Sequence, residues 1–149
     1  MNSFSNFMYT SVLVTAIISW FVAQILKVIG VLIKEKHIDF KRLIGSGGMP
    51  SSHSSFVTAL TTAVLIKDGL CSTTFAISCV MSLVVMYDAA GVRYAAGQQA
   101  KILNKLIDEW ESSTPLDKEK KLKELLGHTP KEVFAGAVLG IAIGIIRHI

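Results

Sequence analysis

Two histidines occupy similar places in this chain, each between serine or threonine and a stretch of apolar residues. His53 lies in Gly-Gly-Met-Pro-Ser-Ser-His-Ser-Ser, residues 47–55, and His128 lies in Gly-His-Thr-Pro-Lys-Glu-Val, residues 127–133. A helix that begins at such a junction presents unpaired N–H groups and the positive end of its dipole, which favour an anion. An imidazole can also attack phosphorus or donate a proton near neutral pH. The pair therefore predicts a two-histidine site for a ligand that carries phosphate.

Part of the second junction has a purely structural explanation. Thr129, Pro130 and Glu132 have the spacing of a capping box, in which the threonine and the glutamate satisfy the first N–H groups of a helix. That motif needs no histidine, so it leaves His128 unexplained. A serine could cap the helix after the first junction, and a lone histidine there would be an ordinary interfacial residue. Two such histidines favour a site.

Cations are needed beside these histidines, because the charge of a phosphate ester must be neutralised before a nucleophile attacks. Arg42 and Arg93 are the best candidates, since a guanidinium can hold two phosphate oxygens at once. Lys27 lies inside an apolar stretch, where a charge is costly. It either belongs to the site or extends its ammonium to the membrane surface. Asp88 is expected to pair with Arg93.

The apolar content of the chain indicates an integral membrane protein. Of its 149 residues 51% are hydrophobic, and the mean hydropathy of +0.51 exceeds that of ordinary soluble domains. Residues 8–33 are long enough to cross a bilayer, and residues 73–86 and 133–146 are apolar and uncharged. Residues 54–66 are apolar but short, and could be a buried core helix, a tilted span or a re-entrant segment. We expect one all-α membrane domain over residues 1–149, with about four hydrophobic helices.

The distribution of charge predicts the orientation of these segments. If all of them cross, residues 34–52 and 88–131 share one side of the membrane, and residues 67–69 make a tight connection on the other. The first side carries twelve of the fifteen Lys and Arg residues, and the second carries two, Lys67 and Arg147. The positive-inside rule makes the first side cytoplasmic. Both histidine junctions then lie on the cytoplasmic face of a multi-pass protein of the cell membrane.

An amphipathic insertion, about residues 97–126, separates the third apolar segment from the fourth. Its apolar residues recur with a helical period, with charged side chains between them. They are Ile102, Leu103, Leu106, Ile107 and Trp110. Thr114 and Pro115 have the pattern of a second helix start, and Gly127 of its end. These cytoplasmic helices could lie in the membrane interface, cover the site as a lid or dimerise.

The two histidine junctions resemble motifs of a known superfamily. Residues 50–53, Pro-Ser-Ser-His, are similar to the Pro-Ser-Gly-His motif of type 2 phosphatidic acid phosphatases and vanadium haloperoxidases. Residues 127–136 resemble the last motif of that superfamily. Together with residues 87–93, Tyr-Asp-Ala-Ala-Gly-Val-Arg, they look like its small divergent bacterial and plant branch. The similarity covers about residues 20–145 and implies a phosphatidic acid phosphatase type 2-like helical fold.

This resemblance implies roles for individual residues. His128 would be the nucleophile that forms a phosphohistidine, and His53 the acid that protonates the leaving oxygen. Glu132 would orient the nucleophile, where the superfamily has an aspartate. Such a reaction needs no metal and no other cofactor. The residues expected to bind phosphate are Arg93, Arg42, Lys27 and Ser52.

Two cation motifs of the superfamily have no counterpart in this chain. Where its first motif has a lysine seven positions before Arg-Pro, Arg42 is preceded by Glu35 and followed by Leu43. The arginine expected six positions before the nucleophile is Leu122. Two hypotheses follow. The first is a phosphatase that hydrolyses a lipid-linked or other membrane-associated phosphate ester. The second is a non-catalytic relative that binds anionic lipid head groups or a protein partner.

Other functions have less support, and they bound the expected partners. Transport rests only on Gln24 and Lys27 within a span, and metal hydrolysis lacks ligand spacing. We expect a phosphorylated lipid or another membrane-associated phosphate as ligand, anionic lipids as neighbours, and no nucleic acid. A few short spans bury a polar site poorly, which is compatible with a homodimer.

Overall fold

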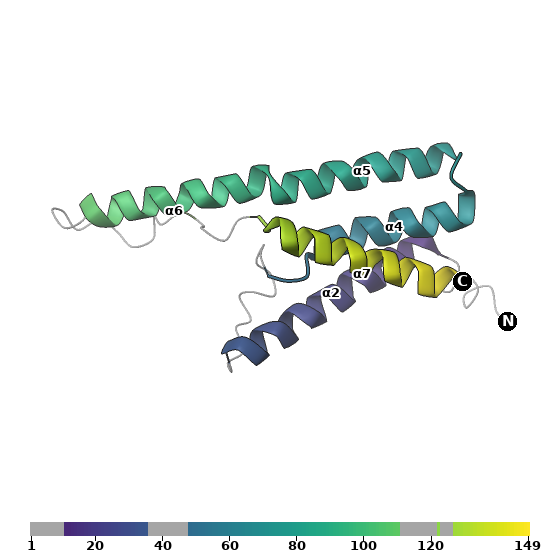
Figure 1. The fold of residues 1–149 in the computed structure, drawn as a ribbon, viewed down its shortest axis with the longest axis horizontal. Coiled ribbons are helices and arrows are strands. Elements are labelled where there is room, and N and C mark those ends of the chain that lie inside the picture. The colour runs from purple at the N-terminus through teal and green to yellow at the C-terminus, as the bar shows by residue number, and fades with distance from the viewer. Residues whose placement is uncertain (1–10, 36–47, 111–121, 123–126) are drawn as a thin grey trace.

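The computed structural model describes residues 11–35, 48–110, 122 and 127–149, which form five helices and no strand. In chain order these are α2 (Val12–Glu35), α4 (Ser52–Asp68), α5 (Thr73–Ala90), α6 (Val92–Trp110) and α7 (Pro130–His148). Helices α2, α4, α5 and α7 form a bundle, and α6 continues from α5 away from it (Figure 1). Each of the four apolar segments thus forms one bundle helix, and the all-helical prediction is confirmed.

Helix α4 is the centre of the bundle, because α2, α5 and α7 all pack against it. Ser51 caps its start, where the side-chain oxygen accepts the backbone N–H of Ser54 at 3.3 Å. It ends at Asp68, and Gly69 with φ of +85° turns the chain toward α5. The tight connection predicted at residues 67–69 is present but lies at residues 69–72, because Lys67 and Asp68 still belong to α4. This packing places residues 54–66 inside the bundle, which agrees with a core helix and with a tilted span.

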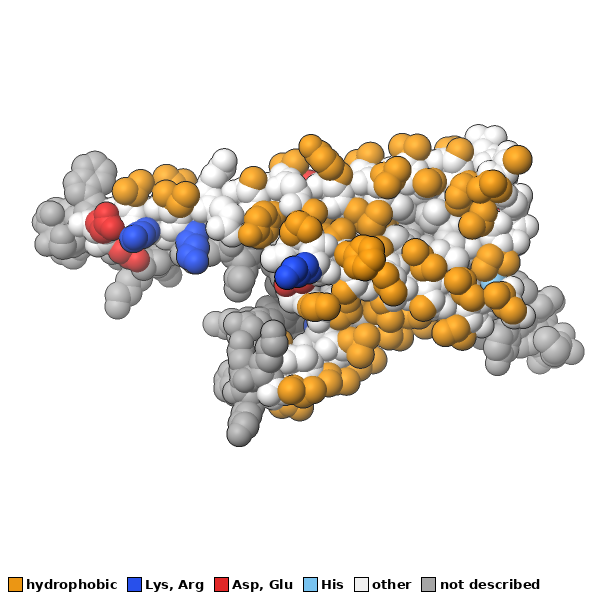
Figure 2. Space-filling model, viewed as in Figure 1, with side chains coloured by type: hydrophobic (Ala, Val, Ile, Leu, Met, Phe, Trp, Pro, Cys, Tyr) orange, Lys and Arg blue, Asp and Glu red, His pale blue; other side chains and the backbone are white. Residues whose placement is uncertain are grey.

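Small and polar side chains fill the interior of the bundle, while large apolar ones cover its outside. Most of the buried side chains are serine, threonine and alanine; the fully buried ones include Thr15, Ser19, Ser54, Ser55, Ala59 and Ala63. The outer faces carry exposed leucine, isoleucine, valine and phenylalanine, as Figure 2 shows over the bundle. Such a surface would be unfavourable in water, but in lipid the apolar side chains lose nothing by facing outward.

Two stretches of the described chain are long and apolar enough to cross a membrane. They are Val12–Ile33 in α2 and Thr73–Glu109, which runs through α5 into α6. Little of either stretch is buried, unlike the core helix of a soluble protein. Whether α4 and α7 also cross remains a prediction from the sequence.

Hydroxyl groups of α4 bond to each of the three helices around it. The Ser55 and Ser19 hydroxyls, from α4 and α2, lie 2.6 Å apart, and those of Thr61 and Ser82, from α4 and α5, lie 2.7 Å apart. Thr58 Oγ1 donates to a carbonyl oxygen of α7 at 3.2 Å. Such interhelical hydrogen bonds hold helices together where no water competes for them.

A row of glycines lets α7 lie directly against α4. Gly136, Gly140 and Gly144 are buried on the face of α7 that contacts α4. A Cβ atom at Gly140 would lie 2.1 Å from Thr58 Oγ1 and 2.3 Å from the Ser55 carbonyl oxygen. These distances leave no room for any side chain, so the two backbones are in contact. The contact fixes how the starts of α4 and α7 lie relative to each other.

Helix α6 is the first part of the predicted insertion, and it begins at Val92 rather than near residue 97. Ile102 and Leu106 are 62% and 55% exposed, so its apolar face has no cover among the described residues. Asn104 is buried, and its side chain bonds both backbone groups of Leu122, at 2.8 and 2.9 Å. The predicted second helix of the insertion lies outside the described residues.

Candidate functional site

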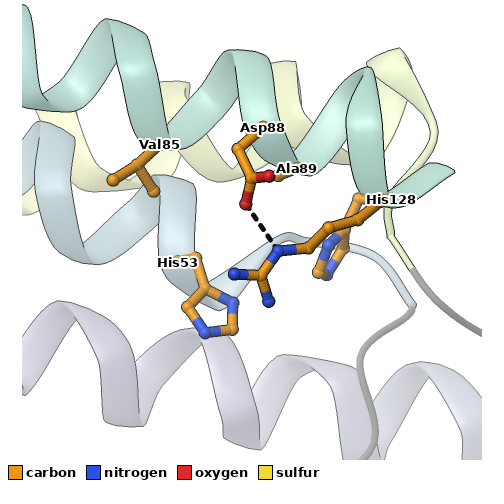
Figure 3. A pocket seen from close by; sticks show the side chains of 6 residues that line it. His53, Val85, Asp88, Ala89 and His128 are labelled. Atoms are coloured by element: carbon orange, nitrogen blue, oxygen red, sulfur yellow. Dashed lines mark hydrogen bonds and ion pairs between the residues drawn. The ribbon is translucent and has the colours of Figure 1, made fainter. Parts of the chain in front are cut away.

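The structure brings the two histidines together. His53 is on the first turn of α4 and His128 directly precedes α7; their ring centroids are 6.2 Å apart, with the ring planes at 72°. Both line a small cavity (Figure 3). The other residues that line it are Val85, Asp88, Ala89 and Arg93. The cavity has a volume of about 30 Å³, which is room for a few water-sized atoms and thus for one small group of a larger ligand.

Ser51 links the start of α4 to the start of α7. Besides capping α4, it donates its backbone N–H to the carbonyl oxygen of Glu132 at 3.0 Å. Ser51 is fully buried, whereas His53, two residues later, is exposed to the cavity side. The cap and this bond therefore hold the His53 backbone at a fixed place relative to α7.

The segment before α7 is fastened to the junction between α5 and α6. The backbone N–H of His128 donates to the carbonyl oxygen of Ala89 at 3.0 Å. Gly127 has φ of +86°, and a Cβ atom on it would lie 2.2 Å from the backbone nitrogen of Tyr94. Only glycine fits there, because the chain passes directly against the first turn of α6. His128 is thereby placed beside Arg93.

The His128 side chain is buried and incompletely satisfied. Only 2% of it is exposed, and its Nε2 atom has no hydrogen-bond partner among the described residues. The pKa of His128 is lowered to about 4, mainly because burial penalises the imidazolium. The Lys27 ammonium acts in the same direction and the Glu132 carboxylate opposes it. The imidazole is therefore neutral at pH 7, as a nucleophile must be.

The capping box at the start of α7 is confirmed. Thr129 Oγ1 accepts the backbone N–H of Glu132 at 3.4 Å, and Glu132 Oε2 accepts the backbone N–H of Thr129 at 2.9 Å. The described bond of the Glu132 carboxylate thus goes to the helix start and not to the His128 ring. Its predicted role in orienting His128 remains a prediction.

Arg93 supplies a guanidinium to the cavity. It lies on the first turn of α6, and its Nε donates to Asp88 Oδ2, on the last turn of α5, at 2.5 Å. The two side chains are 54% and 38% exposed. The predicted pairing of Asp88 with Arg93 is confirmed, and both residues line the same cavity as the histidines.

Lys27 and Ser52 lie behind the cavity rather than on its wall. Lys27 is 7% exposed and its Nζ donates to Ser52 Oγ, which is 3.2 Å away. Of the two alternatives for Lys27, this buried contact with the start of α4 supports the one in which Lys27 belongs to the site. Arg42, the other predicted phosphate ligand, lies outside the described residues.

Two residues of the cavity wall had no signal in the sequence. Val85 is one of many apolar residues of its helix, and Ala89 acts through its backbone carbonyl, which any residue type would supply. The glycine row that aligns α4 and α7 did have a signal, namely three glycines spaced four residues apart.

Comparison with known proteins agrees with these features. The model of a family described as the Divergent PAP2 family matches residues 8–143. The uncharacterized membrane protein YuiD of Bacillus subtilis (strain 168) is 42% identical, over 83% of this chain and 85% of its own length. No solved structure matches the chain. The resemblance to the divergent branch of the type 2 phosphatidic acid phosphatases is confirmed, and this chain belongs to the Divergent PAP2 family.

Proposed function

We propose that this protein is a membrane phosphatase that hydrolyses a lipid-linked or other membrane-associated phosphate ester through His128. The observation that carries the proposal is the buried Nε2 of His128, which has no partner within the described part of the chain and shares one cavity with His53 and Arg93. Leaving a buried polar atom without a partner costs about 1 to 3 kcal/mol. A phosphoryl group bound in the cavity would place a phosphorus atom where Nε2 of His128 can attack it.

The reaction would take place in two steps. In the first, Nε2 of His128 attacks phosphorus, the ester P–O bond breaks, and His53 gives its proton to the leaving oxygen. In the second, His53 takes a proton from a water molecule that attacks the phosphohistidine, and the P–N bond breaks. Arg93 would hold the phosphoryl oxygens during both steps. Fixed cations suit phosphoryl transfer, because its transition state spreads negative charge over those oxygens.

The positive charge at the site comes from outside the two superfamily cation motifs. Arg93 reaches the cavity from α6, and Lys27 acts from behind Ser52. Lys27 lies close enough to His128 to favour its neutral form. Arg42 is a further proposed phosphate ligand. These cations offer a physical substitute for the missing lysine and arginine.

The proposed substrate is bound to the membrane on its cytoplasmic side. The cavity lies where apolar helices α4 and α7 begin, at the end of the bundle to which the charge distribution assigns the cytoplasm. A phosphorylated lipid would place its head group there while its tail stays in the bilayer. Anionic lipids and a second copy of this chain remain the proposed neighbours.

Phosphate release from a panel of lipid phosphates and diphosphates tests the proposal on purified protein in lipid nanodiscs. Replacing His128 by Asn should reduce turnover by about 1,000-fold or more, because the nucleophile is lost. His53→Asn should cost about 100- to 10,000-fold, the usual contribution of a general acid. His148→Asn is the matched control, since His148 is at the other end of α7, and it should stay within about twofold of the wild type.

A trapped intermediate distinguishes this mechanism from hydrolysis by a contaminant. Wild-type protein that is turning over a substrate radiolabelled in its phosphoryl group, when quenched in base, should carry label in an acid-labile, base-stable bond, and His128→Asn should not. Equal phosphate release by the wild type, His128→Asn and His53→Asn would refute the proposal.

A non-catalytic relative that binds anionic head groups is the second candidate. The observation that favours it is Glu132, whose carboxylate bonds the start of α7 instead of His128. In that case the wild type would bind lipid phosphate without turning it over, and binding would survive His128→Ala.

A further inference from the structure

Asp88 is the cavity residue whose charge the proposed reaction does not use. It lines the wall together with the histidines and Arg93, and it points from α5 toward the space that they share (Figure 3). A carboxylate in that position repels an incoming phosphate. Asp88 must therefore contribute something to folding or binding that outweighs this repulsion.

Helix stability is not that contribution. Asp88 is on the last turn of α5, near the negative end of the helix dipole, and Arg93 is on the first turn of α6, near a positive end. Each charge is at the end of its helix where the dipole disfavours it. Both side chains are also substantially exposed, and ion pairs of this kind add little to folding.

The geometry of the pair indicates the contribution instead. The Asp88 carboxylate accepts a hydrogen bond from Nε of Arg93. Among the described residues, this bond engages one edge of the guanidinium and leaves its two terminal nitrogens for a ligand. A guanidinium carries five N–H groups in a rigid fork, and the terminal ones can bind phosphate oxygens while Nε stays with a carboxylate. Arg93 lines the same cavity as both histidines, so its terminal nitrogens are available to a phosphate bound there.

We propose that Asp88 is a positioning residue, which holds the Arg93 guanidinium over the cavity so that its terminal nitrogens meet the phosphoryl group. A half-exposed arginine without such a partner would sample many rotamers and would lose their entropy on binding. Asp88 removes that freedom beforehand. The inference rests on the proposed function only in that the cavity takes phosphate; it does not require turnover.

The test is the affinity of the full-length protein in nanodiscs for inorganic phosphate, measured by isothermal titration. Arg93→Gln should weaken binding by about 10- to 100-fold, the usual size for a charge-assisted hydrogen bond to phosphate. Asp88→Ala should weaken it by about 10-fold although it removes a negative charge from the wall. Asp88→Asn should bind within about threefold of the wild type, because the amide oxygen can still accept Nε.

The double variant Asp88→Ala, Arg93→Gln separates positioning from simple repulsion. If Asp88 acts through Arg93, the double variant should bind phosphate no more weakly than Arg93→Gln alone. Equal or tighter binding by Asp88→Ala than by the wild type would overturn the inference, and so would an Asp88→Ala loss that persists without Arg93. A wild type that binds no phosphate would overturn it together with the phosphate site. Phosphate binding without any hydrolysis would refute the phosphatase and leave the role of Asp88 standing.

Discussion

The bundle has a histidine near each of its ends, and the surroundings of the two differ. At the end where the chain finishes, His148 on the last turn of α7 has its Nε2 2.9 Å from the Thr15 hydroxyl of α2. Arg147 also donates to that hydroxyl. At the other end, His128 is more deeply buried, yet its Nε2 finds no partner among the described residues.

The difference separates a structural histidine from a candidate functional one. Hydroxyl groups are abundant in this interior, and one of them satisfies His148 across two helices. The fold could therefore have satisfied His128 in the same way. The fold instead places His128 in a cavity with Arg93 and within electrostatic reach of Lys27, where an anion would be stabilised. An unsatisfied group among cations is a better indicator of function here than burial or residue type alone.

The largest effect is expected from a substitution between α4 and α7, which would disturb the surroundings of both His128 and His148. Gly140→Val should separate α4 from α7, because its side chain would enter the space of Thr58 Oγ1 and the Ser55 carbonyl. Phosphatase activity should fall below detection, and the His148 contact with Thr15 should be lost as well. Ala142→Val is the control, since Ala142 is exposed on the same helix. Phosphate release and resistance to unfolding in detergent are measured for both variants. An active, stable Gly140→Val protein would contradict the close backbone contact between α4 and α7.

A smaller effect concerns proton binding at His128. The folded-state pKa of His128, about 4, is below the usual unfolded value of roughly 6.5, so the unfolded chain takes up a proton first as pH falls. The contribution of His128 should therefore lower the free energy of unfolding progressively as pH falls from about 6.5 to about 4. Protonation of His128 should not reduce kcat/KM until the pH approaches about 4, because the imidazole remains a neutral nucleophile above that value. NMR of isotope-labelled histidine measures the midpoint, with His128→Gln to assign the signal. A midpoint near 6.5 would show that the ring is solvated.

The smallest effect compares the two histidines by stability. His148→Leu should lower the free energy of unfolding by about 1 kcal/mol, because the bond to the buried Thr15 hydroxyl is lost. His128→Leu should leave it unchanged or raise it, because an unsatisfied buried nitrogen is removed. Reversible unfolding in detergent provides both values. A larger loss for His128→Leu than for His148→Leu would make His128 a structural residue.

Local features of this fold could be predicted from the sequence. The capping box of Thr129 and Glu132 and the turn at Gly69 depend on residues close in the chain, and both are present. The pairing of Asp88 with Arg93 is local too, since one short helix junction separates them. Charge placed the junctions of His53 and His128 on one face, but the approach of the two rings to 6.2 Å depends on how α4 and α7 pack.

Features that depend on contacts between helices could not be derived in the same way. The direction of Lys27 depends on whether Ser52 comes within reach, and that follows from how α2 packs on α4. That no described residue bonds Nε2 of His128 depends on the positions of all the side chains packed around it, which the sequence does not specify. The carbonyl oxygen of Ala89 accepts the backbone N–H of His128. Any residue type could make this backbone contact, so the sequence does not indicate it. The resemblance to a family supplied the roles of the histidines, and packing supplied the role inferred for Asp88.

The interior of hydroxyls, glycines and alanines has a consequence for how this protein responds to temperature. The large apolar side chains face outward, so separating the helices within lipid would transfer few of them into water. The positive heat-capacity change of unfolding in soluble proteins comes from hydration of newly exposed apolar surface. With little such surface to hydrate, helix separation here should have a small heat-capacity change. Its free energy would then vary almost linearly with temperature, without the maximum that soluble domains show near room temperature.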